Sequence, residues 1–135
     1  MKQFLKRSIL IMAVMITSSC SFNDETTNMI IENVRSAFEE EGMELIVKED
    51  KSETFNYPIS KEAKYKFEGG TIYLFYGFNE TKQIEGNIRA TLAVTEFTYP
   101  PQVAYYDNFA IIFMPNTDRN KISEKVYLVL ERLKK

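Results

Sequence analysis

Two short segments that are apolar on both faces constrain the fold of this chain most strongly. In residues 71–78, Tyr73 and Phe75 share the strand face opposite to Ile72. The second segment, FAIIFM over residues 109–114, is apolar throughout. Strands of this kind lie at the centre of a sheet, or carry a core face that is backed by an exposed aromatic strip. The sequence therefore predicts a sheet that is built around these two segments.

Further strands are predicted on either side of them. Residues 43–48, MELIVK, and the alternating stretch 63–67 both favour a strand. Residues 102–107 are expected to form a hairpin with 109–114. The polar segment 49–62 contains a proline and is predicted to be a loop or a weak edge strand.

Three segments have apolar residues at helical spacing. Residues 28–41 and 120–133 each predict an amphipathic helix, and Gly42 is a suitable stop for the first. Residues 80–98 are ambiguous, because their Thr- and Val-rich end favours a strand and Gly86 weakens a helix interior. We expect a helix there from about 80 to 93. The core residues predicted for the two amphipathic helices are Ile30, Val34, Ala37 and Phe38 in the first, and Ile122, Val126, Val129, Leu130 and Leu133 in the second.

This order of elements predicts an α+β fold. We expect a mostly antiparallel sheet of four to five strands with two or three helices packed on one face. The segments AFEEEGMELIV, GGTIYLFYGFNE and VAYYDNFAIIFMP give the chain a layout similar to that of small Gram-positive lipoproteins of uncharacterised activity. That resemblance implies no known activity.

The N-terminus has the order of an export signal. A basic head, MKQFLKR, precedes an apolar run over residues 8–16, small polar residues and then Cys20, the only cysteine. The apolar run would rise only about 14 Å as a helix. A membrane-spanning helix needs about 20 residues, so a permanent transmembrane anchor is not expected.

This segment resembles a bacterial lipoprotein signal peptide that ends in a lipobox. The resemblance implies cleavage between Ser19 and Cys20, with a diacylglycerol on the sulfur and, as an open alternative, an added N-acyl chain. Thr17 departs from the branched apolar residue that is usual at its position. The expected parts are a removed signal peptide over 1–19, a lipidated tether over 20–26 and one domain over 27–135. The alternative is an uncleaved or conventionally cleaved signal in which the cysteine is unmodified.

Composition narrows the chemistry. The chain has no histidine, which removes Ser-His-Asp and Cys-His catalysis, and with one cysteine it predicts neither a metal site nor an internal disulfide. Without Lys2, Lys6 and Arg7, 14 of the 17 basic residues remain beside 19 acidic ones. An acidic domain of this kind is not expected to bind nucleic acid.

We therefore expect a lipid-anchored, non-enzymatic binding module at the outer face of the cytoplasmic membrane. Its partner would be an envelope protein, peptide or glycan, and no dissociable cofactor is expected. Tyr73 and Phe75 are the candidate binding surface, because aromatic residues on a sheet face suit such contacts. The alternative is an immunity- or inhibitor-type protein that acts against an extracellular toxin or enzyme. A hydrolase that uses carboxylates such as Asp107 and Asp118 is the least favoured interpretation.

Overall fold

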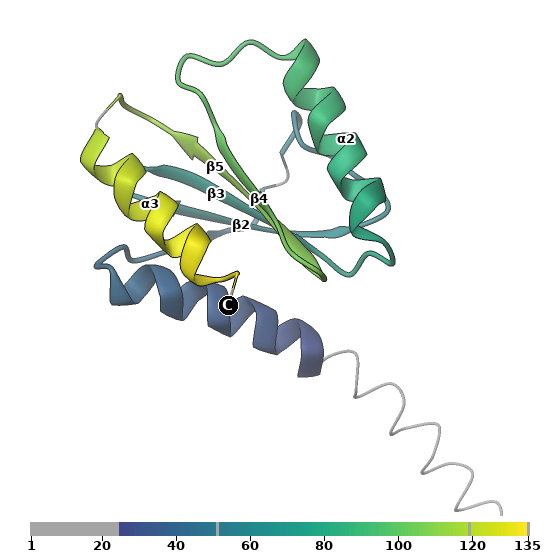
Figure 1. The fold of residues 1–135 in the computed structure, drawn as a ribbon, viewed down its shortest axis with the longest axis horizontal. Coiled ribbons are helices and arrows are strands. Elements are labelled where there is room, and N and C mark those ends of the chain that lie inside the picture. The colour runs from purple at the N-terminus through teal and green to yellow at the C-terminus, as the bar shows by residue number, and fades with distance from the viewer. Residues whose placement is uncertain (1–24, 51, 119, 135) are drawn as a thin grey trace, which may run out of the picture. The chain divides into compact units, whose positions relative to one another are not determined.

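The structure, a computed structural model, describes residues 25–50, 52–118 and 120–134 (Figure 1). The chain divides into two compact units, Met1–Glu32 and Asn33–Lys135, and the fold described below is that of the second unit. The predicted cleavage and lipidation positions, Ser19 and Cys20, lie outside the described residues.

The second unit contains an antiparallel sheet of five strands. The strands follow the spatial order β1-β2-β3-β5-β4, so that β1 and β4 are its two edges. Their bounds are β1 Ile46–Lys48, β2 Lys61–Phe67, β3 Gly70–Tyr76, β4 Gln102–Tyr105 and β5 Phe109–Pro115. The two segments that are apolar on both faces form β3 and β5, which lie side by side within the sheet. The predicted α+β class and the predicted central strands are confirmed.

One face of the sheet packs against α3, Asn120–Arg132, and against the helical residues 33–40 of the same unit. We call it the α3 face. The ring of Phe67 lies 6.5 Å from that of Phe38 and 5.6 Å from that of Phe113, measured between centroids. α3 buries Val126, Val129 and Leu130, which belong to its predicted apolar stripe.

The other face packs against α2, Thr81–Val94, and we call it the α2 face (Figure 1). A second core lies here, made of Phe55, Phe75, Ile84, Ile88, Ala110 and Ile112. Two helical segments therefore share one face, as the sequence predicted, and the third helix covers the opposite face. The reason is the apolar character of both faces of β3 and β5, since each apolar face must be covered.

A glycine ends the helix that precedes β1. Residues 25–40 are helical, and Gly42 has a φ of +79°, which is in the left-handed region. The amide of Met43 donates to the carbonyl of Phe38 at 3.0 Å, and that of Gly42 to Glu39 at 2.9 Å. These bonds satisfy the last carbonyls of the helix and turn the chain toward β1.

Candidate binding surface

The exposed aromatic strip predicted at Tyr73 and Phe75 does not exist, because this face of β3 is covered. Phe75 is fully buried, and Tyr73 is only partly accessible beneath α2 and the segment 52–60. The ring of Phe55 lies 5.2 Å from that of Tyr73, and Tyr57 packs on Phe75 at 5.3 Å. The two residues belong to the second core, so an accessible surface has to be sought elsewhere.

The fold does not bring together Asp107 and Asp118, the carboxylates of the hydrolase interpretation. Asp107 lies in the turn before β5 and Asp118 follows the end of the same strand, so a seven-residue strand separates them. Within the described residues, no group of three His, Cys, Asp or Glu side chains could hold a metal ion.

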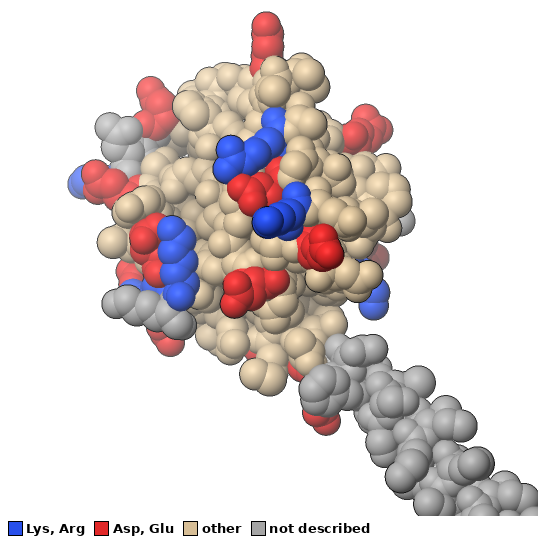
Figure 2. Space-filling model, turned by 45° about the vertical axis from the view of Figure 1, so that its right-hand side comes forward, with Lys and Arg blue, Asp and Glu red and all other residues tan. Residues whose placement is uncertain are grey.

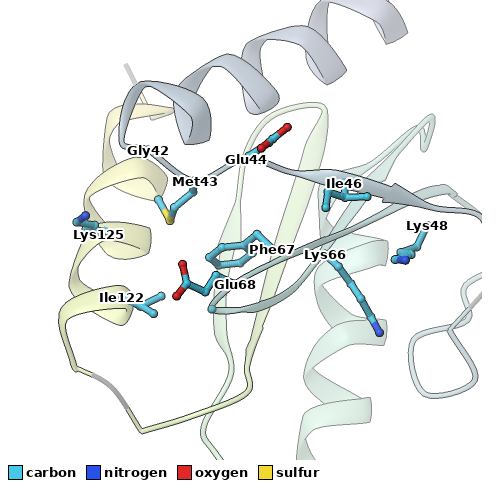
Figure 3. A pocket seen from close by; sticks show the side chains of 11 residues that line it. Gly42, Met43, Glu44, Ile46, Lys48, Lys66, Phe67, Glu68, Ile122 and Lys125 are labelled. Carbon is cyan, nitrogen blue, oxygen red and sulfur yellow. The ribbon is translucent and has the colours of Figure 1, made fainter.

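A hollow of about 510 Å³ lies at the start of β1, and we call it the β1 cavity. The approach to β1, the β2–β3 turn and the first turns of α3 form its walls. Figure 3 shows Met43, Phe67 and Ile122 pointing toward one another at its centre, with Glu68 beside them. The cavity therefore has an apolar floor, built from three segments that are distant in sequence: the loop before β1, the end of β2 and the start of α3.

The β2–β3 turn is held in place at this floor. The side-chain amide of Asn116 donates to the carbonyl of Glu68, and its backbone amide donates to that of Gly69, each at 3.1 Å. A Cβ at Gly69 would overlap the Ile122 and Phe67 side chains. Glycine at this turn lets the turn approach α3 closely, and that approach closes one side of the cavity.

Three lysines surround the β1 cavity. Lys48 and Lys66 lie on one side and Lys125 on the other, with Glu44 and Glu68 also in the lining (Figure 3). All five side chains are exposed, and none of them forms an ion pair with another described residue. The lining therefore carries one net positive charge, although the whole chain is acidic.

A second hollow, of about 500 Å³, lies between β2 and the segment 52–60. Its main ion pair is already formed, because Lys64 contacts Asp50 at 2.7 Å. The hydrogen bond from Lys64 lowers the pKa of Asp50, and the same bond raises the pKa of Lys64. These two charges are satisfied within the fold, which makes this hollow a weaker ligand site than the β1 cavity.

The edge strand β1 is the most exposed part of the sheet. Ile46 is 56% exposed and Val47 is 54% exposed, although both are apolar. β1 pairs only with β2 in the described sheet, so its other side offers free backbone groups. The sequence predicted this strand but not its exposure, because a run that is apolar on both faces usually indicates burial.

Comparisons with protein-family models, with curated proteins and with solved structures found no match. Among the residues that the structure describes, no helix combines the length and the apolar character needed to cross a bilayer. On the face shown in Figure 2, acidic and basic side chains are interspersed and form no field of a single sign.

Proposed function

We propose that this protein is a lipid-anchored, extracytoplasmic binding module that takes its ligand at the β1 cavity and catalyses no reaction. The anchor rests on the N-terminal sequence, where a basic head, an apolar run and small residues precede the single Cys20. Two acyl chains give a durable attachment, since each buried methylene contributes about 0.8 kcal/mol.

The observation that carries the binding role is the make-up of the cavity. An apolar floor at Met43, Phe67 and Ile122 with lysines on two sides suits a ligand that has both an apolar part and an acidic group. An envelope protein, peptide or glycan with a carboxylate or a phosphate has this chemistry. The domain would then hold that ligand close to the membrane.

Substitution of the cysteine tests the anchor. We expect Cys20→Ala to abolish labelling of the protein by radioactive fatty acid and its retention in the membrane fraction. Cys20→Ser should behave in the same way, because a hydroxyl is not a thiolate. Labelling that persists in either variant would contradict the proposed anchor.

Charge reversal in the lining tests the cavity. A photo-reactive amino acid in place of Phe67 should capture an envelope component in intact cells. Lys66→Glu and Lys125→Glu should reduce that capture several-fold, because each places a negative charge where an acidic group would lie. Lys121→Glu is the matched control, since Lys121 is an exposed lysine of α3 outside the lining. Equal capture in all three variants, or turnover of a substrate by the purified chain, would contradict the proposed function.

A further inference from the structure

The outer side of β1 is a sheet edge without a cover. Its two apolar residues, Ile46 and Val47, are each more than half exposed. The described part of the sheet places no strand beyond them. An edge with free backbone groups and apolar side chains is a template for another strand.

The charges around Ile46 are arranged symmetrically. Glu44 lies two residues before it and Lys48 two residues after it. Glu44 and Ile46 are exposed while Leu45 between them is buried, which is the alternation of an extended chain. β1 begins at Ile46, so a strand that pairs through Glu44 extends it by two residues. In that extended strand Glu44, Ile46 and Lys48 would share one face, with opposite charges on the two sides of an apolar centre.

An antiparallel pairing of two copies centred on Ile46 matches these charges. Ile46 would lie opposite Ile46 of the second copy, and Glu44 of each copy would lie opposite Lys48 of the other. Side chains directly opposite each other have Cβ atoms about 5 Å apart, which is within reach of an ion pair. The same register places Leu45 opposite Val47.

The pairing also supplies charge that β1 lacks. Within one copy, Lys48 lies directly opposite Lys64, and Ile46 lies opposite Lys66. Like charges directly opposite each other are destabilising, and the nearby carboxylate of Asp50 is already paired with Lys64. A glutamate from a second copy would give Lys48 its missing counter-charge.

We propose that a second copy of this chain docks on β1 in antiparallel register, so that two five-stranded sheets join into one. The interface is isologous, because the same three residues supply both halves. An acidic peptide would also match the lysines, but it gives no role to Glu44, whereas a second copy uses it. This inference goes beyond the proposed ligand site but shares residues with it, because Glu44, Ile46 and Lys48 also line the β1 cavity. Lys66 and Lys125 are the two lining lysines outside the pairing register.

Crosslinking at the proposed two-fold axis tests the geometry. The full chain with Ile46→Cys, in membranes, should give a covalent dimer with a short thiol crosslinker. Leu128→Cys is the matched control, because Leu128 on α3 is also 56% exposed. The unsubstituted chain measures any background from Cys20. Equal dimer yields at positions 46 and 128, or no dimer above background at 46, would overturn the proposal.

Exchanging the charges of Glu44 and Lys48 tests whether the partner of β1 is a second copy of the chain. Sedimentation of the full chain in detergent should show that Lys48→Glu and Glu44→Lys each weaken dimer formation roughly tenfold, because each places like charges face to face. The double variant Glu44→Lys/Lys48→Glu should restore the dimer, and this rescue also shows that the chain still folds. Failure of the double variant to restore it would overturn self-pairing in this register.

Lys66→Glu and Lys125→Glu should leave the dimer intact, because neither residue lies in the pairing register. A loss of ligand capture in these variants without a loss of dimer would separate ligand binding from strand pairing. A loss of dimer in both variants would contradict the register centred on Ile46.

Discussion

The two edges of the sheet are formed by similar short strands and have different surroundings. β4 is half-buried or buried along its length, and helices cover it on both faces. The side chain of Gln102 donates to the Ser123 carbonyl at 3.0 Å, and the Tyr106 hydroxyl donates to the Leu130 carbonyl at 2.7 Å. β1 is exposed at every residue. A strand sequence therefore does not determine whether the faces of an edge strand are covered, and the neighbouring helices decide it.

The largest expected difference is between two isoleucines. Ile112 in β5 is fully buried in the second core, whereas Ile46 in β1 is 56% exposed. We expect Ile112→Ala to lower the free energy of unfolding by about 2–5 kcal/mol, because it removes buried methylene groups and leaves a cavity. Ile46→Ala should change it by less than about 0.5 kcal/mol. Urea denaturation of the dilute full chain measures both, and equal losses would contradict the exposure of Ile46 at the β1 edge.

The hydroxyl of Tyr106 gives the next largest effect. It lies beside β4, and Tyr106→Phe removes its buried hydrogen bond to α3, so we expect a loss of about 1–2 kcal/mol in the free energy of unfolding. Tyr127→Phe is the control, since Tyr127 is an exposed tyrosine of α3. Equal losses in the two variants would show that the hydrogen bond to Leu130 does not stabilise the packing of α3 beside β4.

Tyr106 also makes the stability of the fold depend on pH in the alkaline range. Burial, with a smaller effect of Glu131, raises the pKa of Tyr106 above its usual value of 10.0. The folded state therefore favours the neutral hydroxyl, and its contribution is complete below pH 10 and is lost as the pH rises above that value. In Tyr106→Phe this part of the alkaline loss should disappear. The prediction would be contradicted if Tyr106→Phe lost as much free energy of unfolding above pH 10 as the unsubstituted chain does.

Substitutions at two glycines are expected to have effects of opposite sign, and that at Gly86 is the smallest of all. Gly86 lies in α2, which covers the β4 half of the sheet, and an added Cβ would meet nothing within 4 Å. Gly86→Ala should stabilise the fold by up to about 1 kcal/mol. Gly42 before β1 has a positive φ, so Gly42→Ala should destabilise it by about 1–2 kcal/mol. Thermal unfolding measures both, and shifts of the same sign would contradict the backbone assignments.

Most elements of the fold could be predicted from local pattern. The segment 80–98 was ambiguous in the sequence, and Ile84 and Ile88 supplied the helical spacing that favoured a helix from about 80 to 93. The structure has α2 there, Thr81–Val94. The strongly apolar β3 and β5 identified the sheet interior. The position of α2 on the opposite face could not be predicted, because the periodicity of a helix shows that it has an apolar side but not which sheet face that side meets.

The candidate site could not be predicted from the sequence. Tyr73 and Phe75 have the composition of a contact surface, but the same composition suits a second core. The floor of the β1 cavity is formed by Met43, Phe67 and Ile122, which come from the loop before β1, from β2 and from α3. Only the tertiary structure brings them together. The opposite charges of Glu44 and Lys48 are visible in the sequence. They indicate a pairing surface only once the structure shows that β1 is an edge strand.

Amide hydrogen exchange of the full chain at low and high protein concentration tests the difference between the edges most directly. We expect the β4 amides that bond to β5 to exchange slowly at both concentrations. Those of Ile46–Lys48 should exchange rapidly in the dilute protein and become protected as the concentration rises. Equal protection of the two edges in the dilute protein, or exchange of β1 that does not depend on concentration, would contradict an open edge that pairs with a second copy.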